Sequence, residues 1–135
     1  MSKKQKTFDT NICSYVLRKH PQNMLERFAK LDRDEVWLSA IVAAELRFGV
    51  AKLAVPKFSG VVESWLAGFE IRPWPVKAAH HYAQTRNQLE RIGRPIGGMD
   101  LMIAAHVQSE DSILITNNAK EFLRVPDLIV EEWQI

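Results

Sequence analysis

Three acidic residues in this chain occupy positions that are typical of catalytic or metal-binding side chains. Asp9 follows a short extended lead-in and precedes an apolar helical pattern, Glu45 lies amid alanine and aliphatic neighbours, and Asp100 opens another predicted helix. Acidic residues also stabilise the first turn of a helix, so Asp9 and Asp100 each have a purely structural interpretation as well. The chemical interpretation depends on whether the three carboxylates converge.

Carboxylates that share one pocket favour a bound cation. Two unit charges about 4 Å apart repel by roughly 4 kcal/mol at an effective dielectric constant near 20. An all-oxygen set of ligands suits Mg²⁺, with Mn²⁺ as the alternative, better than it suits zinc. A hard cation can polarise a phosphate and activate a water molecule as the nucleophile, which is the chemistry of metal-dependent nucleases.

The elements that must position these acids alternate between strands and helices. Periodicity predicts helices over residues 12–20, 24–31, 40–49, 58–69, 76–92 and 99–107, and a brief one around residue 121. Strands are predicted at 35–38, 70–74, 112–116 and 128–130, after a short first strand that ends before Asp9. This alternation predicts a three-layer α/β/α fold with a central parallel sheet and helices on both faces. Ligands in such sheets bind beyond the carboxyl ends of the strands.

Length, charge and cysteine content limit the class of protein. A chain of 135 residues is one domain by length, so residues 1–135 are predicted to form a single domain. The net charge of +2 is too small to identify a nucleic-acid binder by itself. No apolar run is long enough to cross a membrane, and no apolar signal core follows the basic residues 1–6. Because Cys13 is alone, it has no internal disulfide partner, and a reduced, cytoplasmic location is expected.

Four segments follow one another at separations that match a known family. They are residues 8–12 with Asp9, 39–49 with Glu45, 93–106 with Asp100, and 116–126, which begins with Thr-Asn-Asn. In this order they resemble the successive motifs of PIN-domain ribonucleases, most closely the VapC toxins of type II toxin–antitoxin systems. The resemblance spans almost the whole chain and implies a PIN-like three-layer fold.

The resemblance also implies a function and the residues that perform it. It implies a metal-dependent, site-specific endoribonuclease that inhibits translation by cutting tRNA, with the anticodon loop of initiator tRNA as the expected substrate. Asp9, Glu45 and Asp100 match the family's acids: the two aspartates would hold Mg²⁺, and Glu45 would contribute to the metal site and orient or deprotonate the attacking water. A VapB-type antitoxin is the implied protein partner.

A fourth active-site group and the binding surfaces are less directly specified. Relatives often carry a further acid just after the fourth strand, where this chain has Asn117, the predicted contributor, with Asn118 or Glu121 as alternatives. Charge on amphipathic helices is usually a solvated face, but four cations are candidates for holding the RNA backbone: Arg18, Lys19, Arg86 and Arg94. The apolar stripe over residues 58–69 is typical of core packing. It is also the candidate contact for the antitoxin or for a homodimer, through Val62 and Trp65.

Several alternatives stay open at this point. A PIN-like module that binds RNA or a partner protein without cutting would not need three acids. A phosphotransferase with Asp9 as its nucleophile would carry a second aspartate two residues on, where this chain has Asn11. The histidines share no ligand spacing, so His106 is interpreted as a core or surface residue. The polar lead-in before Phe8 leaves the seating of the first strand undecided.

Overall fold

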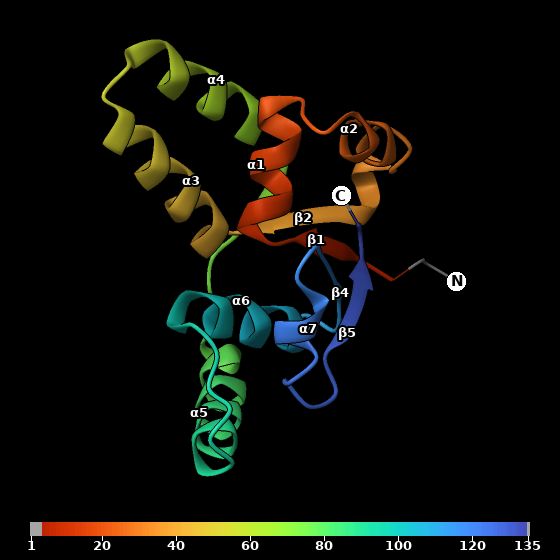
Figure 1. The fold of residues 1–135 in the computed structure, drawn as a ribbon, viewed down its shortest axis with the longest axis vertical. Coiled ribbons are helices and arrows are strands. Elements are labelled where there is room, and N and C mark those ends of the chain that lie inside the picture. The colour runs from red at the N-terminus through yellow and green to blue at the C-terminus, as the bar shows by residue number, and fades with distance from the viewer. Residues whose placement is uncertain (1–3, 135) are drawn as a thin grey trace.

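A computed structural model describes residues 4–134, and a five-stranded, fully parallel sheet lies at its centre (Figure 1). The strands are β1 (Lys6–Phe8), β2 (Val36–Ser39), β3 (Glu70–Arg72), β4 (Ile113–Thr116) and β5 (Ile129–Glu132), in the order β3-β2-β1-β4-β5. From β1 the chain builds the sheet outward through β2 and β3, then returns to the other side of β1 for β4 and β5. The topological switch point therefore lies between β1 and β4, where ligand sites form in sheets of this kind.

Helices cover both faces of the sheet, which confirms the predicted three-layer fold (Figure 1). One face carries α1 (Thr10–Arg18), α2 (Gln22–Ala29), α3 (Ala40–Leu53) and α4 (Pro56–Leu66), and the other carries α5 (Val76–Arg91) and α6 (Gly98–Ser109). A 3₁₀ turn, η1 (Arg33–Glu35), leads into β2, and the short helix α7 (Ala119–Phe122) packs on β5.

The first strand is short but firmly seated. β1 has three residues and pairs with β2 on one side and β4 on the other, with Phe8 in register with Ile115. The Phe8 side chain is 1% exposed, and its ring centroid lies 5.6 Å from that of Trp133 and 5.7 Å from that of Phe28. Burying one such aromatic side chain stabilises a fold by about 1.5–3 kcal/mol. The polar lead-in therefore does not loosen the residue that follows, Asp9.

The helix starts next to the site are fixed by side-chain caps. The capping residue of α1 is Asp9, whose Oδ1 accepts a hydrogen bond from the Ile12 N–H at 3.0 Å. Ser39 caps α3 in the same way, through the N–H of Ile41 at 3.1 Å. Both helices consequently begin at a defined residue at the carboxyl end of a strand.

Some element boundaries differ from the prediction. Helix α3 continues past Gly49 to Leu53, because the intervening residues, Ala51 and Lys52 among them, are good helix formers. Helix α4 begins at Pro56, in the first turn where proline is tolerated, and ends before the turn into β3. β3 lies at the edge of the sheet, as the proline that follows it requires. Residues 1–3, part of the basic segment noted in the sequence, and residue 135 lie outside the described residues.

Within residues 4–134, none of the helices combines the length and apolar character that crossing a bilayer requires.

Candidate active site

Asp9 is buried at the switch point of the sheet. Its side chain follows β1 directly, its backbone N–H bonds to the carbonyl of Ile115 at 3.1 Å, and only 3% of the residue is exposed. Oδ1 caps α1, and Oδ2 accepts a hydrogen bond from the hydroxyl of Thr116 at the end of β4. Burial raises the pKa of Asp9 above its ordinary value, against the lowering effect of these two hydrogen bonds. The capping and the chemical interpretations of Asp9 are therefore compatible.

Glu45 reaches the same region from the second turn of α3. The residue is half-buried, and its Oε1 accepts a hydrogen bond of 2.5 Å from the hydroxyl of Thr10, the first residue of α1. The charge of Glu45 contributes to the raised pKa of both Asp9 and Asp100, so the three carboxylates lie within electrostatic reach of one another.

Asp100 lies in the first turn of α6, on the opposite face of the sheet from α3. Its pKa is raised to about 7, first by burial, then by the nearby charges of Glu121, Asp9 and Glu45, and by a hydrogen bond with Glu121. A carboxyl that titrates this high carries the electrostatic signature of a functional site. The helix dipole alone would have the opposite effect, because it stabilises a negative charge in the first turn.

The three predicted acids converge. They line a single pocket of about 200 Å³ that is open to solvent, formed by Asp9, Thr10, Asn11, Glu45, Asp100, Asn118 and Phe122. The first turns of α1, α3 and α6 meet at the centre of the molecule, where β1 and β2 end (Figure 1). Among residues 4–134, no group of three or more His, Cys, Asp or Glu side chains stands close enough together to hold a metal ion. The pocket is thus acidic and wet, with carboxylates on several sides.

The predicted fourth group, Asn117, does not line this pocket. Its Nδ2 donates to the hydroxyl of Tyr15 at 3.3 Å, and its Oδ1 is buried without a hydrogen-bond partner. Asn118 does line the pocket, and its Nδ2 donates to Glu121 Oε2 at 2.7 Å. Glu121 also accepts the N–H of Gly97 at 3.3 Å. The geometry therefore favours the two alternatives, Asn118 and Glu121, over Asn117.

Two hydroxyl groups belong to the site that the sequence did not assign to it. Thr116 holds Asp9, and Thr10 holds Glu45. Thr116 also accepts the N–H of Asn118 at 2.9 Å, which fixes the turn that follows β4. Only their positions in the sequence could have indicated this role, because each threonine lies in one of the motif segments, at or next to the carboxyl end of a strand. Hydrogen-bond partners, however, follow from three-dimensional contacts that spacing does not specify.

The four candidate RNA-binding cations differ in their positions relative to the acidic pocket and in whether another side chain already binds them. Arg18 and Lys19 end α1, so the helical rise puts them about 13 Å from Asp9. Arg86 donates to Glu90 at 2.7 Å and to the hydroxyl of Tyr82 at 2.9 Å, so its guanidinium is already engaged. Arg94 is exposed in the loop between α5 and α6, the loop that leads to Asp100. Its backbone N–H bonds to the carbonyl of Leu89 on α5 at 2.9 Å, and Arg94 does not line the acidic pocket, so it is exposed but lies away from the three acids.

His106 is a core residue, in agreement with its interpretation from the sequence. It is fully buried, with Nδ1 2.8 Å from Ser39 Oγ and its ring centroid 4.7 Å from that of Trp37. Burial lowers its pKa to about 4, so the imidazole is neutral at pH 7. Ser39 also caps α3, so His106 helps to hold the helix that carries Glu45.

The apolar stripe on α4 divides into buried and exposed parts. Val62 is only 7% exposed, and Trp65 is half-buried, with its ring 4.6 Å from that of Phe69. Phe58 and Val61 are 40% and 53% exposed, and both line a groove of about 610 Å³ between α1, α3 and α4. We call this hollow the α1/α3/α4 groove. A partner on α4 would therefore meet Phe58 and Val61 first, with Val62 at the groove wall.

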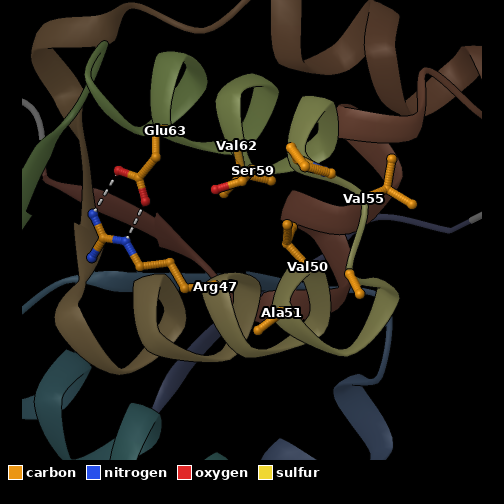
Figure 2. A pocket seen from close by; sticks show the side chains of 9 residues that line it. Arg47, Val50, Ala51, Val55, Ser59, Val62 and Glu63 are labelled. Carbon is orange, nitrogen blue, oxygen red and sulfur yellow. Dashed lines mark hydrogen bonds and ion pairs between the residues drawn. The ribbon is translucent and has the colours of Figure 1, made fainter.

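The far side of the α3–α4 hairpin is closed by an ion pair (Figure 2). Arg47 of α3 donates to both carboxylate oxygens of Glu63 on α4, at 2.7 and 3.0 Å. To the right of this pair in Figure 2, Val50, Ala51 and Val55 line a second hollow of about 470 Å³, which Arg47 and Glu63 also line. The pair is exposed, so its contribution to stability is small, but it ties together the two helices that border the α1/α3/α4 groove.

The sequence and the fold can now be compared with known proteins. Residues 6–128 match the PIN domain family. The chain belongs to the PIN-domain family. Within it, a ribonuclease VapC2 of Rickettsia felis is 41% identical over 129 residues, with 93% of this chain and 95% of the relative covered. A tRNA(fMet)-specific endonuclease VapC of Shigella flexneri is 36% identical over 126 residues, with the same coverage. At these identities the chain is a VapC-type PIN protein, and both relatives carry the names of nucleases.

Solved structures of VapC-type PIN proteins share the fold over their full length. VapBC from Salmonella typhimurium bound to DNA superimposes with a TM-score of 0.88 at 35% identity, covering 97% of this chain and 99% of that one. VapBC2 from Rickettsia felis, bound to a DNA fragment from their promoter, gives a TM-score of 0.84 at 38% identity, covering 96% and 98%. The predicted PIN-like fold is therefore confirmed by sequence and by structure.

Proposed function

We propose that this PIN-domain chain is the toxin of a VapBC-type pair and acts as a metal-dependent, site-specific endoribonuclease. The observation that carries the proposal is the convergence of Asp9, Glu45 and Asp100 in one solvent-open pocket at the switch point of the sheet. A module that only binds RNA has no use for three carboxylates in one pocket, where burial and neighbouring negative charges raise the pKa of Asp9 and Asp100.

The chemistry of the pocket fits a hard divalent cation, Mg²⁺ first and Mn²⁺ as the alternative. All the acidic donors are carboxylate oxygens, and burial together with neighbouring negative charges raises the pKa of Asp9 and Asp100, which a bound cation would counteract. When bound, the cation supplies charge stabilisation at the scissile phosphate and a water of lowered pKa.

The residues of the pocket would have different roles in catalysis, according to their positions. Asp9 and Asp100, on opposite faces of the sheet, would bind the cation from two sides. Glu45 would contribute from α3 and would orient the attacking water and accept its proton. Asn118 and Glu121 would complete the pocket beside Asp100, because they form a hydrogen-bonded pair there. The outcome is hydrolysis of a phosphodiester bond in RNA.

Transfer RNA is the proposed substrate, with the anticodon loop of initiator tRNA as the specific target. The support is the name of the relative from Shigella flexneri, a tRNA(fMet)-specific endonuclease, and the open pocket, which suits an unstacked loop. Arg94 would hold a phosphate at the α5–α6 loop, and Arg18 and Lys19 would hold phosphates at the end of α1. Cleavage of tRNA would take place in the cytoplasm, where translation would be inhibited.

A VapB-type antitoxin is the proposed partner, and the α1/α3/α4 groove is its proposed docking surface. The similar structures are VapBC complexes. Two hollows lie between α3 and α4, and the α1/α3/α4 groove is the larger one. Phe58 and Val61, the exposed apolar side chains of α4, line this groove. The groove shares Thr10, Asn11 and Glu45 with the acidic pocket, so a chain seated in it extends to the site. Homodimer formation stays a prediction.

The test is incubation of the purified chain with total RNA, with EDTA or with Mg²⁺, followed by mapping of the cut ends. The proposal predicts discrete cuts in tRNA that disappear with EDTA and return with excess Mg²⁺ or Mn²⁺. RNA binding without cleavage under every metal condition would instead identify a non-cleaving module. Cleavage that is unaffected by EDTA would contradict the metal site.

A further inference from the structure

The short hydrogen bond between Thr10 and Glu45 links two helices across the acidic pocket. Thr10 Oγ1 donates to Glu45 Oε1 at 2.5 Å, at the short end of the range for O–H···O hydrogen bonds. Thr10 is the first residue of α1 and follows Asp9 directly, whereas Glu45 is on α3. The bond therefore joins the backbone that carries one acid to the side chain of another.

This bond is the only hydrogen bond recorded for the Glu45 side chain among residues 4–134. A glutamate has three side-chain torsions, and a half-buried one that is held at neither oxygen loses little by changing rotamer. With Oε1 held by Thr10, the position of Oε2 is defined as well. Asp9 needs no such help, because both of its oxygens are already bonded.

The packing of α1 on α3 does not depend on this bond. Ile12 of α1 and Val42 and Leu46 of α3 belong to the same buried apolar cluster. Thr10 and Glu45 are both half-buried, so water can replace the partners of either side chain. Loss of the hydroxyl is consequently expected to disturb the site much more than the fold.

We propose that Thr10 is a positioning residue that holds the Glu45 carboxylate in its working orientation relative to Asp9. This inference rests on the proposed function, because it assigns the way in which one of the acids of that site is aimed. Loss of the hydrogen-bond partner of a metal-site group typically lowers metal affinity or activity about 10–100-fold.

The test compares Thr10→Val, which keeps the shape and removes the hydroxyl, with Thr10→Ser, which keeps the hydroxyl. Thr10→Val is expected to lower kcat on tRNA about 10–100-fold with little change in KM, and to weaken Mn²⁺ binding measured by calorimetry. Thr10→Ser is expected to restore both. The melting temperature of Thr10→Val is expected to fall by at most about 5 °C. Thr85→Val, at a buried threonine of α5 outside the acidic pocket, is the matched control for loss of a hydroxyl.

Two further outcomes separate this inference from the function on which it rests. If the wild-type chain cleaves RNA and Glu45→Gln does not, but Thr10→Val keeps wild-type kcat and Mn²⁺ affinity, the positioning role is overturned and the proposed function stands. If Thr10→Ser is as impaired as Thr10→Val, the hydroxyl is not the group that matters and the inference is again overturned. If the wild-type chain neither binds Mn²⁺ nor cuts RNA, both are wrong.

Discussion

Thr116 donates its hydroxyl proton to Oδ2 of Asp9, so the last residue of β4 holds the carboxylate that follows β1. The other oxygen of Asp9 is held by the start of α1. The two strands that flank the switch point, β1 and β4, thus both help to fix the Asp9 carboxylate, and Asp9 is almost completely buried. A carboxylate fixed at both oxygens has a defined direction, which a metal site requires.

Substitution of Asp9 should separate its chemical role from its structural one. Asn caps helices about as well as Asp, so Asp9→Asn is expected to keep the fold while lowering cleavage activity at least about a hundredfold. Asp9→Ala removes the cap as well and should cost about 1 kcal/mol of stability beyond the loss of activity. Cleavage assays together with denaturant unfolding measure both effects. Full activity in Asp9→Asn would show that this acid is not part of the site.

The contribution of Asp100 to the stability of the metal-free chain should rise as the pH falls from about 8 to about 5. The pKa of Asp100 is about 7 in the folded chain and near 3.8 when unfolded, so between these values the folded state binds a proton that the unfolded state does not. Stability therefore rises as pH falls through 7. Denaturant unfolding in EDTA at several pH values measures this slope, and Asp100→Asn should flatten it.

Comparison with Asp100→Asn is essential because another buried group acts in the opposite direction. Burial lowers the pKa of His106 to about 4, so its neutral form is favoured in the folded chain and stability is lost as pH falls from about 6.5 to 4. This contribution is common to wild type and Asp100→Asn and cancels in their difference. Added Mg²⁺ should raise the melting temperature more at pH 8 than at pH 5.5, because protons compete for Asp100. An equal rise at both pH values would argue against Asp100 as a ligand.

The identity of the fourth group can be decided by three substitutions. Glu121→Gln and Asn118→Ala are expected to lower kcat about tenfold or more, because these side chains pair beside Asp100. Asn117→Ala should lower it much less, because Asn117 bonds to Tyr15 outside the pocket. The reverse order of effects, at equal melting temperatures, would restore Asn117 as the fourth group.

Binding of the RNA backbone should depend more on Arg94 than on Arg86. In an Asp100→Asn background that binds without cutting, Arg94→Ala should weaken tRNA binding and reduce the slope of log affinity against log salt by about 1. Arg86→Ala is the matched comparison, and it should have the smaller effect because Glu90 and Tyr82 already hold that guanidinium. Equal slopes for both variants would contradict the placement of phosphate beside the α5–α6 loop.

Antitoxin binding should depend on the exposed part of the α4 stripe. Phe58→Ser removes a 40% exposed side chain from the α1/α3/α4 groove, whereas Phe48→Ser removes a 66% exposed side chain that does not line it. We expect the first variant to weaken co-purification with the VapB-type antitoxin and the second to leave it intact. A polar residue at Val62 is a poorer test, because burial there would also destabilise the fold. Equal complex formation by both serine variants would place the antitoxin elsewhere.

The sequence predicted the layers of the fold and the three acids because both follow from local patterns. Apolar periodicity located the helices, and a continuous apolar run identified β4. The short β1 was harder to predict, since its seating depends on Phe8 packing against Trp133 from the far end of the chain. Such contacts between distant segments leave no periodic trace.

The details of the site depended on side-chain directions that spacing does not specify. Asn117 and Asn118 are adjacent in sequence, but the first turns toward Tyr15 and only the second lines the acidic pocket. The same limit applies to α4, where neighbouring valines, Val61 and Val62, differ in exposure from 53% to 7%. Residue type and position were therefore enough to predict which three acids share a pocket, and the structure was needed to decide which neighbouring side chain faces it.

The most direct test of the three-acid site is a calorimetric titration of the purified chain with Mn²⁺ at pH 7.5, performed for wild type, Asp9→Asn, Glu45→Gln and Asp100→Asn. The proposed site predicts saturable binding by the wild-type chain and markedly weaker binding by Asp9→Asn and Asp100→Asn, with all four proteins folded. Wild-type Mn²⁺ affinity in both aspartate variants would show that these carboxylates do not hold the cation.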